Sequence, residues 1–148
     1  MIVQTLKTIF KRDLNRLKQE IELYPNESQI WKIQKGITNS AGNLCLHLVG
    51  NLNTYIGNTY GNSNYVRNRE LEFSLKDIPR SELIHQIEQT ILVVDHALDN
   101  LSEKELLMEF PVLVFETTTS NEFMLIHLTT HLTFHLGQIN YHRRLMGE

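Results

Sequence analysis

A chain of 148 residues has the length of one ordinary domain, so we expect a single domain over residues 1–148. Its 41% hydrophobic and 21% charged residues lie in the range of globular proteins and exclude a disordered or fibrous chain. The net charge of −3 gives no general attraction to phosphate backbones or anionic lipid, so we expect neither nucleic acid nor a membrane as a partner.

Apolar residues at intervals of three and four predict a first helix over about residues 2–23, which Pro25 and Asn26 would end. This segment has neither the continuous apolar run nor the cleavage site of a signal peptide, and no segment is apolar enough to span a bilayer. The single cysteine, Cys45, lies between two leucines, which is typical of a buried apolar side chain. We therefore expect a cytoplasmic protein.

Asn39 or Ser40 can cap a second helix that reaches about Ile56, before Gly57 and Gly61 break the pattern. The residues from about 58 to 80 are rich in asparagine, then charged, and they predict a long connection rather than a core element. Connections of this length often carry function.

Two arginines in this connection, Arg67 and Arg69, allow two interpretations. They can receive an anionic group of a substrate, or they can pair with nearby acids such as Glu70 and Glu72. Arginines in such charged segments more often pair with acids, so we favour the second interpretation.

Ser81 can cap a third helix that runs to about Leu98, with Asn100 as its stop, and residues 102–105 predict a helical turn. The buried stripe of the third helix would consist of Ile84, Ile87, Ile91, Val94 and Leu98.

Residues 111–116 predict a short extended piece. Thr119 with Glu122 resembles a capping box that opens a fourth helix over about residues 120–146, and Gly147 would end it. Four amphipathic helices joined by polar segments predict an all-α four-helix bundle, with long connections between helices two and three and between helices three and four.

Three histidines, His127, His131 and His135, lie four residues apart on one face of the last helix. Neighbours in this series are one turn apart and can share a metal ion, whereas the outer pair, about 12 Å apart along the axis, cannot. A zinc-like ion needs a further ligand from another helix, and His47 is the best candidate because its helix is equally apolar.

A lone histidine on a half-buried helix usually only hydrogen-bonds to a neighbour, so His47 by itself would indicate no metal site. Clustering changes this interpretation, because bundles often build metal sites from inward-facing side chains on several helices. His85, His96 and His142 have no partner at ligand spacing, and we expect them at surface or helix-end positions.

Two segments resemble the DinB/YfiT superfamily of bacterial four-helix metalloproteins: residues 40–52, which contain His47, and the run His131-Leu-Thr-Phe-His135-Leu-Gly-Gln138. Members share one histidine on the second helix and a His-x-x-x-His-x-Gly-Gln pattern on the last. The resemblance extends over nearly the whole chain. Residues 64–73, with the Gly50-Asn51 pair, look most like a branch of unassigned function.

The resemblance implies that His47, His131 and His135 are the metal ligands and that His127 lies outside the coordination sphere. Three neutral imidazoles leave a divalent ion an open position, as in catalytic sites. Imidazole suits zinc, nickel, iron and copper, of which we expect zinc first and nickel second. Characterised relatives include thiol S-transferases that use bacillithiol or mycothiol and a thiol-dependent maleylpyruvate isomerase, in which the metal activates the thiol.

Asn51 and Gln138 are candidate catalytic or supporting residues. Asn51 lies one turn beyond His47, where it would either hydrogen-bond to bound water or substrate or merely face a polar connection. Gln138 lies one turn past His135, where it would either hold that ligand or tie down a neighbouring helix.

Three functions follow from these observations. The first is a metal-dependent enzyme, a transferase or hydrolase that moves a low-molecular-weight thiol onto an electrophile or acts on such a conjugate. The second is a non-enzymatic metal-binding bundle, such as a sensor or stress-related binding protein, and a substrate-sized cavity beside the ion would favour the enzyme over it. The third is an interaction module whose histidines bind no metal. Related bundles often pair along helix faces, so we also expect a homodimer.

Overall fold

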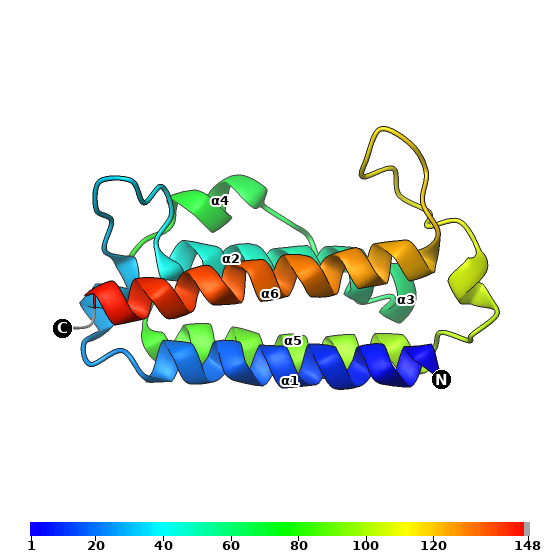
Figure 1. Ribbon diagram of the computed structural model, residues 1–148, viewed down its shortest axis with the longest axis horizontal. Coiled ribbons are helices and arrows are strands. Elements are labelled where there is room, and N and C mark those ends of the chain that lie inside the picture. The colour runs from blue at the N-terminus through cyan, green and yellow to red at the C-terminus, as the bar shows by residue number, and fades with distance from the viewer. Residues whose placement is uncertain (147–148) are drawn as a thin grey trace.

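The computed structural model describes residues 1–146, and four long helices account for most of it (Figure 1). These are α1 (Ile2–Glu22), α2 (Ala41–Leu52), α5 (Arg80–Asp99) and α6 (Asn121–Met146). Short helical segments lie between them, namely η1 (Glu27–Trp31), η2 (Asn53–Asn58), α3 (Thr59–Gly61), α4 (Arg69–Ser74) and η3 (Glu105–Leu107). The described residues contain no strand, and the predicted all-α four-helix bundle is confirmed.

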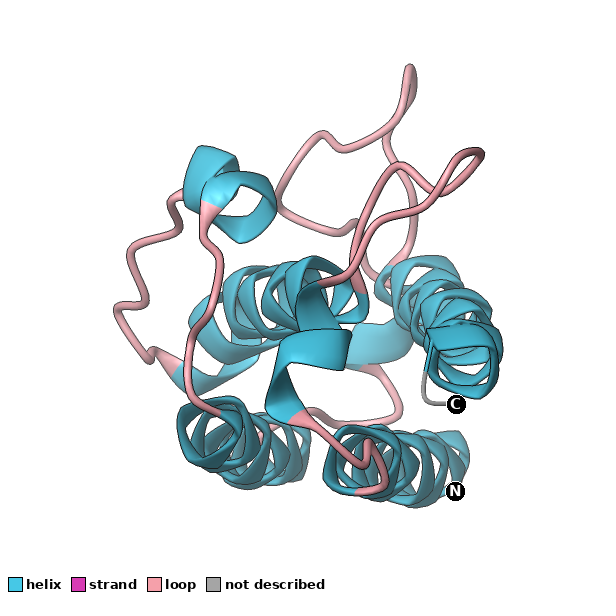
Figure 2. Cartoon of the chain, turned by 90° about the vertical axis from the view of Figure 1, so that its left-hand side faces the viewer, coloured by secondary structure: helices cyan, strands magenta, loops and turns pink. Residues whose placement is uncertain are grey.

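The four long helices form a bundle in which α1 and α6 run in one direction and α2 and α5 in the other (Figure 1). Figure 2, which views the bundle from one end, shows their cross-section, with α4 outside it. Helix α1 packs against α5 and α6, and α2 packs against the same two helices. Because α2 and α5 are parallel, the chain has to return along the bundle between them.

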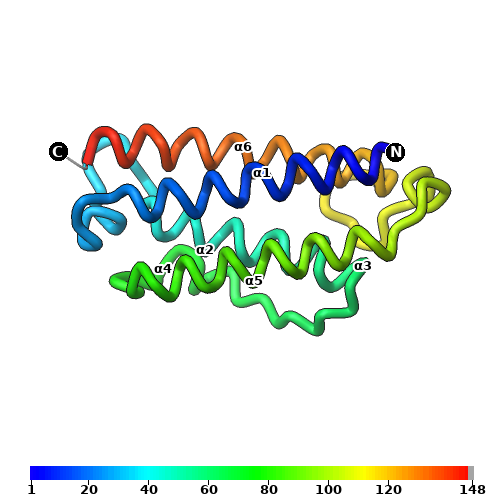
Figure 3. The backbone as a smooth tube through the Cα atoms, turned by 90° about the horizontal axis from the view of Figure 1, so that it is seen from below, coloured from blue at the N-terminus to red at the C-terminus, as the bar shows by residue number. Residues whose placement is uncertain are grey.

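The returning segment, seen in Figure 3 as the loop that leaves α3, carries α4. Helix α4 packs on the outer side of α2 (Figure 1). The side-chain amide of Asn43 on α2 fixes it there, because Nδ2 donates to the backbone carbonyls of Glu72 at 2.9 Å and Leu75 at 2.8 Å. With α4 on one side and the bundle on the other, every residue of α2 is buried. The predicted long connection is present, but part of it forms the short helix α4, and polar bonds to α2, rather than an apolar stripe, hold α4 in place.

The second helix also extends beyond the predicted end at Ile56. The π-helical turn η2 and then α3 continue it to Gly61, and Asn62 ends it in the left-handed conformation, with a φ of 49°. Gly57 does not break the helix but lets it pack closely against α5, since a Cβ atom at this position would lie 2.7 Å from Val93 of α5.

The other helix ends lie close to their predicted positions. Helix α1 ends within one residue of the prediction, and Asn100 follows α5 as expected. Ser81 does not cap α5, which begins at Arg80 directly after Pro79.

The start of α6 differs from the predicted capping box. The hydroxyl of Ser120, rather than that of Thr119, accepts a hydrogen bond from the backbone N–H of Phe123, at 3.1 Å. Residues 111–116 form an irregular loop and not an extended piece, and only an isolated bridge joins Glu109 to Ser120 at its base. Gly147, the predicted stop, lies outside the described residues.

The core is one continuous cluster of buried apolar side chains from all four long helices. On α5, three members of the predicted stripe are buried, while Ile84 and Ile91 are partly buried. Cys45 is buried as predicted, and burial raises the pKa of its thiol to about 12. None of the described helices has the length and apolarity needed to cross a membrane.

His142 lies near the end of α6, one of its two expected positions, but it is buried rather than at the surface. It lies 2.6 Å from the hydroxyl of Tyr24 through Nδ1 and 2.8 Å from the backbone carbonyl of Lys32 through Nε2. Its place three residues after Ile139 and four before Met146 puts it on the buried side of α6. His85 and His96 are exposed, as expected.

Candidate metal centre

Three histidines from two helices meet between α2 and α6, next to α4. His47 comes from α2, and His131 and His135 come from successive turns of α6. One nitrogen atom from each ring can be chosen so that all three lie within 4.8 Å of one another. The Nε2 atoms of His47 and His131 are 3.2 Å apart, and the ring centroid of His135 lies 4.6 Å from that of His131. Such a group can hold a divalent metal ion.

Glu72 fixes the orientation and the protonation of His47. Its Oε1 atom lies 3.0 Å from Nδ1 of His47, and Arg67 donates to the same carboxylate from Nε at 2.8 Å and from Nη2 at 3.0 Å. Burial raises the pKa of Glu72, but the hydrogen bonds from His47 and Arg67 outweigh it, so the pKa lies below its ordinary value. An ionised carboxylate only accepts hydrogen bonds, so Nδ1 of His47 carries the proton and Nε2 presents its lone pair.

The carboxylate of Glu72 reaches His47 because position 50 has no side chain. A Cβ atom on Gly50 would overlap the Oε2 atom of Glu72. Gly50 lies three residues after His47 on α2, so the glycine leaves space for α4 on the same side as the histidine.

Gln138 contacts Nδ1 of His135 through a side-chain oxygen, as Glu72 contacts Nδ1 of His47. The Oε1 atom of Gln138 lies 2.7 Å from Nδ1 of His135, and a proton on Nδ1 leaves the lone pair on Nε2. Metal-binding histidines usually donate their second ring nitrogen in this way. The structure therefore places Gln138 where the first of its two interpretations requires it.

Two of the three imidazoles have environments that favour the neutral state, which metal binding requires. Burial, together with the neighbouring His135 and His47, lowers the pKa of His131 to about 4. Burial also lowers the pKa of His135, and the hydrogen bond to Gln138 only partly offsets this effect.

Two buried polar atoms at the centre have no hydrogen-bond partner within residues 1–146. They are Nδ1 of His131 and Oδ1 of Asn51, which lies one turn beyond His47. Buried polar atoms without partners are rare and often mark a site for a ligand or an ion. Together with the lone pairs of His47 and His135, this shows that the residues present fit a divalent ion.

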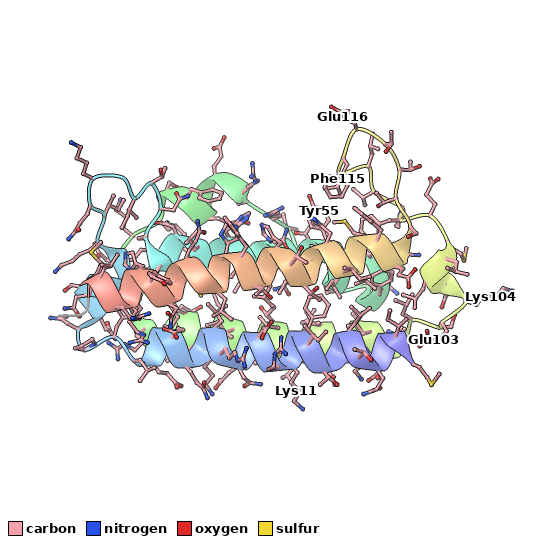
Figure 4. The ribbon with its side chains drawn as sticks, in the orientation of Figure 1. Lys11, Tyr55, Glu103, Lys104, Phe115 and Glu116 are labelled. Atoms are coloured by element: carbon pink, nitrogen blue, oxygen red, sulfur yellow. The ribbon has the colours of Figure 1, made fainter. Side chains whose placement is uncertain are left out.

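A cavity of about 340 Å³ adjoins the triad, within the size range of small-molecule sites. Its lining includes His47, His131 and Asn51, together with Tyr55, Arg67, Arg69 and Val114 of the loop between α5 and α6. Figure 4 shows Tyr55 and Phe115, next to Val114, on the same face of the bundle. This is the kind of cavity that the enzyme hypothesis requires.

The two arginines of the connection have different environments. Arg67 pairs with Glu72, as the favoured interpretation predicted. Arg69 has no ion-pair partner in the described part of the chain, and its guanidinium lies 5.6 Å from the centre of the Phe73 ring.

His127 remains outside the three-histidine group. Its ring packs against Phe115, with centroids 4.8 Å apart, and against Phe123, and it lines the cavity next to His131. Although His127 lies on the same face of α6 as His131 and His135, it lines the cavity and does not belong to the three-histidine group.

Glu72 is the residue of this centre that the sequence interpretation did not assign. It was recognised as a partner for the arginines but not for His47, because its position depends on how the segment after α3 returns over α2. The available signal was Gly50, a position without a side chain close to His47 on a wholly buried helix.

Comparison with known proteins identifies one family. The model of a family described as "Protein of unknown function (DUF1572)" matches residues 2–148 of the chain. No curated protein matches the sequence.

Proposed function

The chain belongs to the DUF1572 family, whose function is unknown, and we propose that it is a divalent-metal-dependent enzyme of the DinB/YfiT-like superfamily. In this proposal His47, His131 and His135 hold one ion, and the enzyme transfers a low-molecular-weight thiol onto an electrophile. The observation that carries it is the convergence of three imidazoles beside a cavity of about 340 Å³.

A divalent ion with three neutral ligands keeps its positive charge and an open position, and it lowers the pKa of a bound thiol or water. The protein's own residues prepare the centre for it. Glu72 and Gln138 each accept a hydrogen bond from Nδ1 of a histidine and so hold the two rings in one tautomer. Zinc is our first choice and nickel our second.

The proposal is tested by following thiol consumption with a model electrophile, chlorodinitrobenzene, and a panel of small thiols. We expect turnover that disappears after chelation and returns with zinc or nickel. His131→Ala should abolish it, whereas the exposed His96→Ala, on α5, should not. Metal binding without metal-dependent turnover of any thiol would favour the second candidate, a non-enzymatic metal-binding bundle.

We also propose a homodimer. The outer face of α6 exposes Phe134, Tyr141 and Leu145, and a Cβ atom on Gly137 between them would meet nothing within 4 Å. An exposed apolar stripe on a helix is typical of an interaction surface. Sedimentation equilibrium of the wild type and of Phe134→Lys tests this, and a monomeric wild type would contradict it. The buried Cys45 agrees with a reducing, cytoplasmic location, which we likewise propose.

A further inference from the structure

The cavity beside the triad has a positive charge that the protein does not neutralise. Among its lining residues the only charged side chains are Arg67 and Arg69. Glu72 neutralises Arg67 through two hydrogen bonds. Arg69 has no acidic partner within residues 1–146, so its charge is available to a ligand.

The same cavity has a buried acceptor without a donor. The Asn51 side chain is only 7% exposed, and its Oδ1 atom is buried with no hydrogen-bond partner in the described chain. Leaving such an atom unpaired costs free energy, and a ligand that donates a hydrogen bond would remove that cost. Asn51 and His47 both line the cavity, so the hydrogen-bond donor of the ligand has to lie near the histidines.

We propose that this cavity binds a small molecule that bears an oxyanion, a carboxylate or a phosphate, which pairs with Arg69, and a hydrogen-bond donor that reaches Oδ1 of Asn51. Guanidinium groups bind both kinds of oxyanion through paired, charge-assisted hydrogen bonds. The inference rests on the proposed function in one respect: if the ligand is a thiol, the metal ion would bind its sulfur, as a third contact besides Arg69 and Asn51.

The role of Arg69 is tested by calorimetric titration with mercaptoacetate and its neutral amide, mercaptoacetamide, on zinc-loaded and metal-free protein. We expect the acid to bind at least about tenfold more tightly than the amide in both forms, because only the acid makes a charge-assisted pair. Arg69→Ala should remove this preference. The matched control is Arg144→Ala, which removes an arginine that also lies over an aromatic ring, that of Tyr141 at 5.2 Å, outside the cavity.

The role of Asn51 is tested with cysteine, which adds an ammonium donor to a carboxylate and a thiol. Asn51→Ala should weaken the binding of cysteine by about tenfold and leave mercaptoacetate nearly unchanged. Equal losses for the two ligands would contradict the assignment of Asn51.

The proposal is overturned if the acid and the amide bind equally, if neither binds, or if Arg69→Ala and Arg144→Ala behave alike. Its failure is distinguishable from that of the proposed function. If the protein retains no metal but prefers the acid through Arg69, the metal proposal fails and the anion site stands. If metal binds at the triad without a preference for the acid, the anion site fails alone.

Discussion

The Oε1 atom of Glu72 lies 3.0 Å from Nδ1 of His47, and this contact connects the candidate metal centre to the chain segment that returns along the bundle. Arg67 donates a hydrogen bond to the other oxygen of the same carboxylate, and the side chain of Asn43 on α2 donates one to the backbone carbonyl of Glu72. The position of α4 therefore controls the orientation of one candidate metal ligand, His47.

Replacing Glu72 tests this relationship. In Glu72→Gln the side chain keeps its size but loses the charge that orients His47, and we expect the affinity for zinc to fall about tenfold to a hundredfold. Competition with a chromophoric chelator measures the affinity. Glu70→Gln, an exposed neighbour on α4, is the control, and equal affinities of the two variants would contradict the role of Glu72.

Gly50→Ala tests the space that Glu72 needs. The new Cβ atom overlaps the Glu72 carboxylate, so α4 has to shift, and we expect the loss of zinc affinity seen in Glu72→Gln together with a lower melting temperature. In Gly137→Ala, on the open face of α6, nothing lies within 4 Å of the new Cβ atom. Alanine should stabilise that helix by up to about 1 kcal/mol. A Gly50→Ala protein with normal stability and affinity would show that α4 does not require this contact.

Asp13 should make stability depend on pH. This carboxylate is 1% exposed and accepts hydrogen bonds from Arg12 at 2.8 Å and from Thr133 of α6 at 3.1 Å. Burial raises its pKa, but these bonds and the charge of Arg16 outweigh that effect and hold the pKa below its ordinary value of 3.8. We expect Asp13→Asn to cost on the order of 2 kcal/mol of unfolding free energy at neutral pH.

The sign of the pH effect follows from the lowered pKa. The ionised carboxylate stabilises the fold above the pKa of the unfolded chain, and this contribution is lost as the pH falls through the lower pKa of the folded protein. Melting curves of the wild type and Asp13→Asn should therefore converge at acidic pH. The exposed Asp99→Asn should have little effect at any pH, since surface ion pairs contribute little. A difference between wild type and Asp13→Asn that does not shrink as the pH falls would contradict the assignment.

The sequence predicted the elements that carry strong periodic signals. Spacings of three and four located α1 and α5, and capping residues located α2 and α6. The four-residue steps from His127 to His135 placed these histidines on one face of α6. The same reasoning could have placed His142 inside, since it continues the stripe between Ile139 and Met146, but it was considered only as a metal ligand, for which it has no partner at the right spacing.

The sequence could not reveal contacts that depend on the path of the chain. Helix α4 has no apolar stripe, and what fixes it is the amide of Asn43, nearly thirty positions earlier, bonded to backbone carbonyls. For the same reason Glu72 could be assigned to Arg67, five residues away, but not to His47. Glycine is ambiguous too: Gly57 looked like a helix break, whereas it gives α5 room to pack closely.

The metal content of purified, untagged protein, measured by plasma mass spectrometry, tests the central claim most directly. We expect about one divalent ion per chain, as three-histidine sites hold. It should be lost in His47→Ala, His131→Ala and His135→Ala and kept in His127→Ala, which alters the cavity wall but no ligand. Absence of metal in the wild type with no uptake of added zinc or nickel, or loss of metal in His127→Ala as complete as in His131→Ala, would contradict the three-histidine site.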